Sequence, residues 1–306
     1  MRLALIGQQA FGRAALDAFA SRGDAVAGVF VAPEKPGAKP DPLHARAQEL
    51  NIPVLQFQRY TGEDALAALR GLNVDLGVMA YVTQFVPQSF VAIPKHGMIQ
   101  FHPSLLPAHR GPSSINWPIM LGERETGLSI FRPVDGLDEG PVILQKRIAI
   151  GADDTLGSIY FDHIYPQGVA ALLEAADLVV AGRAVERAQD ESRASYEGWV
   201  REAEARIAWA QHADIVYNLI RGCNPQPGAW TMVGERRLQI FDARKRGAQT
   251  FGAVKGLKPG QIAATTNDGF TVHAPGGLIE VLRCRFDNGP KIAGKDSGLA
   301  AGTILT

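Results

Sequence analysis

Short apolar runs alternate with helical patterns through the first half of the chain, and this alternation restricts the possible folds more than any other feature. The apolar runs, each long enough for one buried strand, are Leu3–Ile6, Ala25–Val31, Val54–Phe57, Leu76–Ala80 and Met98–Phe101. Segments with helical spacing, such as Phe11–Phe19 and Ala65–Leu69, separate them. Alternation with short connections predicts an α/β fold, in which helices cover both faces of a mostly parallel sheet.

The pattern continues beyond these runs and then changes. We expect a helix from about Ser113 to Leu121, strands at Leu128–Val134 and Val142–Ile150, and a long helix from Leu156 to Ala181 that Asp154-Thr155 caps. After a polar, charged stretch come one helical segment, Ala213–Arg221, and several short alternating runs with hairpin signals between them. The sequence therefore predicts an α/β domain at residues 1–183, a linker at 184–204 and a small β-barrel domain at 205–306.

Composition excludes several broad classes of protein. The 306 residues include 31 basic and 31 acidic side chains, a balance that argues against a dedicated nucleic-acid or membrane-surface protein. No apolar run approaches the ~18 to 20 residues of a membrane span. The two cysteines, Cys223 and Cys284, are too few for a disulfide framework and fit a reducing compartment, so we expect a cytoplasmic protein.

The turn after the first strand is a weak candidate for nucleotide binding. Its sequence, GQQAFG from Gly7 to Gly12, has Gln9 where a dinucleotide-binding turn has its second glycine, and it has no Gly-Lys-Ser/Thr. We therefore expect neither NAD nor ATP to bind. A tight strand-to-helix turn is the favoured interpretation, and a weaker anion site at the helix start is the alternative.

Two loops carry the residues best suited to catalysis. His102 follows a predicted strand, and ligand sites of open α/β sheets lie at the carboxyl ends of strands. An imidazole there can stabilise an oxyanion or move a proton. The second loop, residues 135–140, reads Asp-Gly-Leu-Asp-Glu-Gly, a pattern that fits a turn, a cation site or catalysis. No metal is expected, because the histidines lack the spacing of a zinc site and the acidic loop lacks that of a calcium site.

Taken together, these loops resemble the folate-dependent formyltransferase family. The signature is H-P-S-L-L-P-x-x-R-G, from His102 to Gly111, followed by D-G-L-D-x-G, whose second aspartate, Asp138, lies 36 residues after His102. The resemblance covers nearly the whole chain and is strongest to the amino-terminal hydrolase domain of 10-formyltetrahydrofolate dehydrogenase. It implies a Rossmann-like catalytic domain followed by an OB-like barrel, which methionyl-tRNA formyltransferase shares. No aldehyde dehydrogenase segment follows in the sequence, so we do not expect oxidation of the formyl group.

The resemblance also implies a mechanism and a folate site. The formyl carbon of 10-formyltetrahydrofolate would be attacked by water or an amine. His102 would stabilise the oxyanion, Asp138 would accept or relay the proton, and Ser104 would orient groups in the loop. The pterin would lie against two stretches of backbone, for which we expect these contacts: Met79, Tyr81, Phe85, Pro133, Val134, Asp135 and Asp138.

One position departs from the family pattern. The transferases have asparagine, a second oxyanion donor, two residues before the histidine, and this chain has Gln100. Loss of a well-placed oxyanion donor costs ~10² to 10³ in rate. Two interpretations remain open: Gln100 is a displaced donor, or the chemistry has moved away from transfer to an amine.

Three functions compete. The favoured one removes the formyl group of 10-formyltetrahydrofolate, with water or an unidentified small amine as acceptor. The second is an enzyme like methionyl-tRNA formyltransferase; tRNA is possible but not favoured, because the loop from Pro33 to Pro42 is neutral. A local basic cluster could meet phosphates or be a solvated hairpin: Arg236, Arg237, Arg244, Lys245 and Arg246. The third is a folate-binding module without turnover.

Overall fold

The computed structural model describes residues 1–247, 252 and 254–306. They form two compact units that interleave along the chain. The α/β unit comprises Met1–Gly111, Gly127–Ile148 and Asp162–Tyr196. The C-terminal unit comprises Pro112–Thr126, Ala149–Phe161 and Glu197–Thr306.

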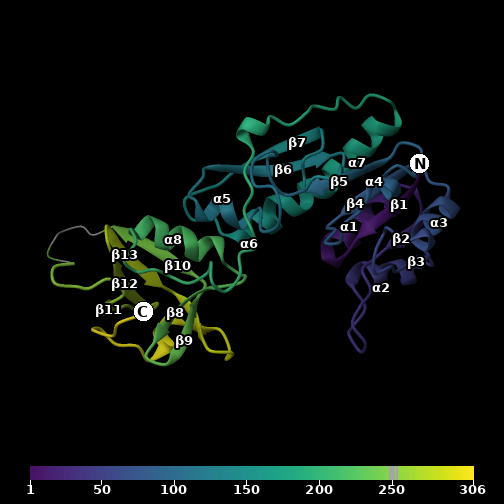
Figure 1. The fold of residues 1–306 in the computed structure, drawn as a ribbon. Coiled ribbons are helices and arrows are strands. Elements are labelled where there is room, and N and C mark those ends of the chain that lie inside the picture. Colours follow the sequence, from purple (N-terminus) through teal and green to yellow (C-terminus); the bar gives the residue numbers. More distant parts are fainter. Residues whose placement is uncertain (248–251, 253) are drawn as a thin grey trace. The chain divides into compact units, whose positions relative to one another are not determined.

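A seven-stranded sheet, in the order β3-β2-β1-β4-β5-β6-β7, organises the first unit (Figure 1). Its strands are β1 (Arg2–Gly7), β2 (Ala25–Phe30), β3 (Val54–Leu55), β4 (Leu76–Ala80), β5 (Met98–His102), β6 (Glu125–Phe131) and β7 (Val142–Ala149). The first five pair in parallel, whereas β6 runs antiparallel to β5, with Gln100 opposite Phe131. The segment that joins β5 to β6 therefore reverses the chain instead of crossing back over the sheet, as a parallel connection must.

Helices cover both faces of this sheet. On one face lie α1 (Gln9–Ser21) and α7 (Tyr165–Val180), where Phe11 stacks on Phe101 of β5 with ring centroids 4.3 Å apart. On the other face, α3 (Glu63–Leu72) and α4 (Gln88–Val91) contribute to a core with side chains of β1, β2 and β4. Another helix, α2 (Pro42–Glu49), packs against α1 and begins at the N-cap Asp41.

The helix expected from Leu156 to Ala181 is divided into three segments. Thr155 and Ser158 form a capping box at α6 (Leu156–Ser158), followed by a π-helix, η1 (Ile159–Ile164), and then α7. Pro166 lies in the first turn of α7 and has no N–H to bond the preceding turn. The helical hydrogen-bonding pattern therefore changes just before it.

Two four-stranded antiparallel sheets form most of the C-terminal unit, ordered β10-β13-β12-β11 and β15-β14-β9-β8 (Figure 1). Their strands are β8 (Ala229–Val233), β9 (Arg236–Ile240), β10 (Ala243–Gly247), β11 (Ile262–Thr265), β12 (Phe270–Ala274), β13 (Gly277–Val281), β14 (Arg283–Phe286) and β15 (Ile292–Ala293). Apolar side chains of both sheets share one core with α8 (Ala213–Gly222). The expected helix from Ser113 is shorter, α5 (Asn116–Met120), and Asn116 donates to the carbonyl of Gly222 at 2.8 Å.

The expected fold class is confirmed: a mostly parallel sheet flanked by helices precedes antiparallel β-sheets. The domain boundaries at residues 183 and 204 stay predictions. None of the helices in the described ranges combines the length and hydropathy needed to cross a bilayer.

Two glycines test how closely the layers pack. A Cβ on Gly168 of α7 would lie 2.6 Å from Cε2 of Phe101, whereas a Cβ on Gly71 of α3 would meet nothing within 4 Å. We expect Gly168→Ala to destabilise the protein by about 1–3 kcal/mol because of overpacking. We expect Gly71→Ala to be neutral or to stabilise by up to about 1 kcal/mol, since alanine is the better helix former. Thermal unfolding of both variants measures the difference; equal midpoints would contradict this packing.

Candidate active site

The end of β5 presents two polar side chains on one face of the sheet. Successive residues of a strand point to opposite faces, so Gln100 and His102 share a face while Phe101 packs against α1 on the other. His102 is buried, with 5% of its surface exposed. Its Nε2 lies 2.8 Å from the backbone carbonyl of His109.

The carboxylate of Asp138 is surrounded by donors. Its Oδ2 accepts from the backbone N–H of Gly111 at 2.9 Å and lies 3.5 Å from Nδ1 of His102. Its Oδ1 accepts a long hydrogen bond, 3.5 Å, from Nε2 of Gln100. The structure therefore brings together His102, Asp138 and Gln100, three of the four residues that the sequence assigns to catalysis.

The hydrogen-bond geometry determines which nitrogen of His102 faces the Asp138 carboxylate. A carbonyl only accepts, so Nε2 of His102 carries a proton and donates it to His109. Nδ1 then faces the Asp138 carboxylate at 3.5 Å. The pair can thus hold a proton at Nδ1 or transfer it to Asp138, which is the requirement for acid–base catalysis.

Ser104, the fourth predicted catalytic residue, stabilises its own loop. Its side chain is completely buried, and its hydroxyl donates to the carbonyl of Ala108 at 2.7 Å. Its backbone carbonyl accepts from the hydroxyl of Ser129 on β6 at 2.7 Å. These bonds hold the loop after β5 against the neighbouring strand, and the orienting role of Ser104 in catalysis stays a prediction.

The predicted folate contacts lie in two loops of the α/β unit. Met79 is the next-to-last residue of β4 and its side chain is buried, so only its backbone could face a ligand. Tyr81 has a left-handed φ of 62°, and the ring of Phe85 is 63% exposed. The loop between them is tied down, because Gln8 donates to the hydroxyl of Thr83 at 3.1 Å.

The second predicted stretch follows β6. Pro133 is buried, and its carbonyl accepts from Gln88 at 3.0 Å. Val134 and Asp135 are exposed, and none of the hydrogen bonds in the described ranges uses the N–H of either residue. These two N–H groups are available to the polar edge of a flat ring.

The start of α1 is occupied by a carboxylate of the chain itself. Both oxygens of Asp41 lie 2.9 Å from the backbone N of Gln9, and Oδ1 also accepts from Leu43. Free N–H groups at a helix start are what an external phosphate would use. The Asp41 carboxylate therefore occupies the position of a bound anion at this turn. An anion site at the helix start is the alternative that the sequence leaves open beside a tight turn.

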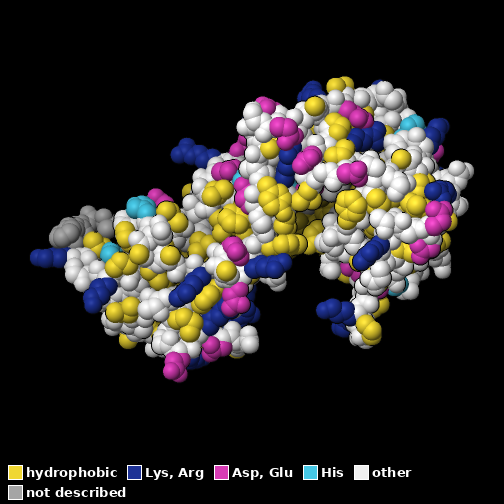
Figure 2. Space-filling model, in the orientation of Figure 1, with side chains coloured by type: hydrophobic (Ala, Val, Ile, Leu, Met, Phe, Trp, Pro, Cys, Tyr) yellow, Lys and Arg dark blue, Asp and Glu magenta, His cyan; other side chains and the backbone are white. Residues whose placement is uncertain are grey.

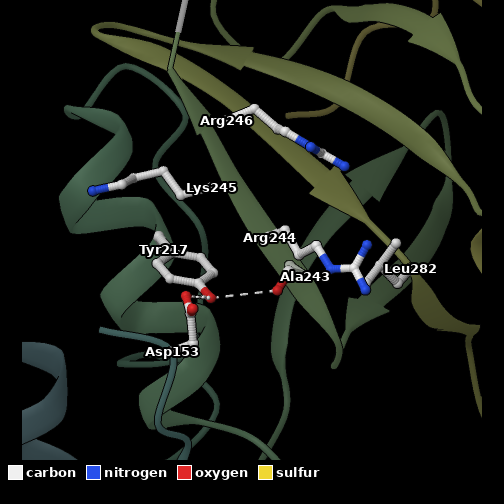
Figure 3. Close-up of a pocket in the computed structure, with 7 residues that line it drawn as sticks. All are labelled: Asp153, Tyr217, Ala243, Arg244, Lys245, Arg246 and Leu282. Atoms are coloured by element: carbon white, nitrogen blue, oxygen red, sulfur yellow. Dashed lines mark hydrogen bonds between the residues drawn. The ribbon is translucent and has the colours of Figure 1, made fainter. Parts of the chain in front are cut away.

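The C-terminal unit contains a pocket of about 320 Å³ (Figure 3). It is lined by Asp153, Tyr217, Ala243, Arg244, Lys245, Arg246 and Leu282. The hydroxyl of Tyr217 donates to Asp153 at 2.8 Å (Figure 3). Burial and this hydrogen bond raise the pKa of Tyr217 well above its ordinary value. Arg244, Lys245 and Arg246 belong to the basic cluster named from the sequence, whereas the pocket itself was not predicted, because its other lining residues come from separate helix, loop and strand segments.

Most cations of the basic cluster already have acidic partners. Lys245 pairs with Asp214, and Arg246 pairs with Glu280 at 2.6 Å. Arg236 and Arg237 pair with Asp287 and Glu202, respectively. Acidic and basic side chains are interspersed over the visible face of the molecule (Figure 2). These contacts fit a solvated hairpin better than a concentrated phosphate-binding surface.

Neither cysteine has the character of a reactive thiol. Both are buried, and burial raises the pKa of Cys223 to about 12 and that of Cys284 to about 11. The thiolate is the nucleophilic form, so both side chains act as small apolar core residues. Within the described ranges, His, Cys, Asp and Glu form no group of three or more that could hold a metal ion.

Comparisons with known proteins identify the family of this chain. Residues 1–175 match the formyl transferase family, and residues 200–298 match the formyl transferase C-terminal domain. The chain therefore belongs to the formyl transferase family.

Two curated relatives represent different members of this family. The chain is 38% identical over 248 residues to cytosolic 10-formyltetrahydrofolate dehydrogenase of Homo sapiens; the match covers 79% of the chain and 27% of that protein. It is 30% identical to methionyl-tRNA formyltransferase of Geobacter metallireducens, over 97% of the chain and 94% of the relative. The chain thus spans about a quarter of the dehydrogenase and nearly all of the tRNA enzyme.

A solved structure shows the same fold. HypX from Aquifex aeolicus, in complex with tetrahydrofolic acid, superposes with a TM-score of 0.68 at 18% identity. The match covers 96% of this chain and 46% of HypX.

Replacing Asp41 tests its role at the start of α1. Asparagine still caps α2 but lacks the charge that favours the α1 terminus, so we expect Asp41→Asn to cost about 0.5–1 kcal/mol. Thermal unfolding measures the loss, with Asp268→Asn in an exposed hairpin as the control. An unchanged midpoint for Asp41→Asn would show that its charge adds nothing at the helix start.

Proposed function

We propose that this chain removes the formyl group of 10-formyltetrahydrofolate and releases tetrahydrofolate, with water or a small amine as the acceptor. The observation that carries the proposal is the buried pair of His102 and Asp138, whose facing atoms are 3.5 Å apart at the carboxyl end of β5. Membership of the formyl transferase family supports the choice of donor.

The reaction with water proceeds through a tetrahedral intermediate. The water oxygen bonds to the formyl carbon, and the proton that it loses passes to Asp138. Nδ1–H of His102 donates to the oxyanion, which stabilises the charge that develops. The carbon–N10 bond then breaks as N10 takes back the proton held by Asp138, and the product leaves as formic acid, which loses its remaining proton to water to give formate. With an amine as nucleophile the same steps give a formamide.

The folate would bind through backbone groups of the two loops described above. The N–H groups of Val134 and Asp135 would donate to the pterin, and the exposed rings of Tyr81 and Phe85 would provide apolar contact. The reaction transfers a formyl group without net oxidation or phosphate chemistry. The proposal therefore includes no NAD, ATP or metal.

A second candidate acceptor is an aminoacyl-tRNA. The specific observation in its favour is the end-to-end match to methionyl-tRNA formyltransferase. The acidic partners of the basic cluster argue against it, because they neutralise charges that phosphates would need.

We also propose a cytoplasmic location. The two free cysteines fit a reducing compartment, and the human dehydrogenase relative is described as cytosolic.

The first test combines the purified protein with 10-formyltetrahydrofolate alone. We expect repeated turnover to tetrahydrofolate and formate, which would make water an acceptor. His102→Asn and Asp138→Asn should each lower kcat by about 10² to 10⁴, because each removes a proton-transfer group. His96→Asn is the matched control, since His96 lies outside the site.

Other outcomes of this test separate the alternatives. Turnover that requires a small amine would favour that acceptor, and turnover that requires charged initiator tRNA would favour the tRNA enzyme. Tight folate binding without turnover, with every acceptor tried, would indicate the non-catalytic module. Wild-type rates in either His102→Asn or Asp138→Asn would refute the mechanism.

Gln100→Met separates the two interpretations of Gln100. Methionine has a similar length but no donor, so the variant loses the hydrogen bond to Asp138. Because the amide is directed at Asp138 and the bond is long, we expect a loss in kcat of about tenfold. A loss of ~10² to 10³ would instead assign the amide to the oxyanion.

A further inference from the structure

A polar segment that the sequence predicts as part of a linker contacts both catalytic loops. We call residues 187–196 the strap. At its first end, Arg187 pairs with Val142 of β7 through two backbone hydrogen bonds, 2.8 and 2.9 Å long. At its other end, Tyr196 pairs with Arg110 in the loop after β5. The strap therefore lies across the α/β unit between these two points.

Gln189, near the middle of the strap, joins the two motifs. Its Nε2 donates to the backbone carbonyls of Asp138 and Gly140, at 2.7 Å each. Its Oε1 accepts from Arg110, at 2.9 Å from Nη2 and 3.2 Å from Nε. One amide thus uses both ends to connect the loop of Asp138 with the loop that follows His102.

Arg110 completes this connection. Its side chain is buried, and it forms a two-pronged ion pair with Glu191 of the strap, with distances of 2.9 and 2.6 Å. The hydrogen bond lowers the pKa of Glu191 and raises that of Arg110, so the pair stays charged at neutral pH. A two-pronged pair fixes the plane of the guanidinium, and with it the direction of the bonds to Gln189.

Ser195 connects the strap to the partner of His102. Its hydroxyl accepts from the N–H of His109 at 2.9 Å, and its carbonyl accepts from the N–H of Arg110 at 3.0 Å. The carbonyl of His109 is the group that accepts from Nε2 of His102. The strap thus binds the peptide of His109, which orients the imidazole of His102. It also binds the peptide of Asp138, which carries the carboxylate.

The backbone at these points needs such support. Asp138 and His109 both have a left-handed φ of 56°, which residues other than glycine seldom adopt. Such conformations persist where the surrounding structure fixes them. Hydrogen bonds from Gln189 to the Asp138 peptide and between His109 and Ser195 supply that restraint.

We propose that Gln189 is a positioning residue, which sets the carboxylate of Asp138 against His102 through the backbone of residues 138–140, and that Arg110 and Glu191 hold Gln189 in this orientation. The inference rests on the proposed function, because it assumes that His102 and Asp138 carry out the chemistry. It assigns Gln189 no contact with substrate.

The test uses two variants of Gln189 in the full chain. Gln189→Met keeps the length but removes the donor without adding charge. Gln189→Glu keeps acceptors for Arg110 but directs an oxygen at the two carbonyls. Arg193→Gln is the matched control, because this exposed side chain lies on the same strap and contacts neither loop.

We expect both Gln189 variants to lower kcat by about 10 to 10²-fold with KM for 10-formyltetrahydrofolate within about twofold, as for a misplaced catalytic group. We also expect amide hydrogen exchange of residues 107–111 and 136–140 to accelerate about tenfold or more, with global unfolding unchanged. Arg193→Gln should match the wild type in every measurement.

Three results would overturn the proposal. Wild-type kcat and exchange in both variants would make the strap a simple covering segment. A rise in KM with unchanged kcat would place Gln189 in folate binding. An equal loss in Arg193→Gln would indicate a general disturbance of the strap. If the wild type itself releases no tetrahydrofolate with any acceptor, the proposed function fails, whereas the exchange measurement still decides whether Gln189 orders the two loops.

Discussion

The carboxylate of Asp138 is the group on which the rest of the site depends. It is buried, and it meets an amide and an imidazole of β5 and a backbone N–H of the loop that follows β5. A buried carboxylate without such donors would be costly, so the loops that supply them have little freedom to move. Gly111 illustrates the restriction: it has a φ of 85°, and a Cβ there would lie 2.6 Å from the ring of Tyr196. The N–H of Gly111 binds the carboxylate, and a side chain at this position would be strained and would collide with Tyr196. The first motif must therefore end in glycine.

Much of this arrangement follows from patterns in the sequence. The alternation of apolar runs and helical segments predicts the sheet and its flanking helices. Strand periodicity places Gln100 and His102 on one face, and the position of His102 at a strand end predicts a site there. These inferences succeed because they rest on local spacing. In a regular strand or helix, the spacing of residues determines to which face their side chains point.

Other features have no local signal. The antiparallel direction of β6 relative to β5 is one such feature, because the apolar pattern of a strand is the same for either direction. The contact of Asp41 with Gln9, and that of Gln189 with Asp138, join residues that are 32 and 51 positions apart. A polar segment such as 187–196 has no apolar periodicity, so its hydrogen bonds to the loops could not be read from its composition. Nor does the family signature reveal it, because the signature consists of the two loops and not of the segment that connects them.

The position of the strap in the chain has a consequence for biosynthesis. The ribosome releases both motifs, including His102 and Asp138, before residues 187–196 are made. During that interval the two loops lack Gln189, Glu191 and Ser195, and the left-handed peptides at His109 and Asp138 have fewer restraints. The α/β layer can therefore form its sheet on the nascent chain while its catalytic loops remain incompletely ordered. Maturation of the site is tied to synthesis of a segment that lies beyond the last helix of that layer.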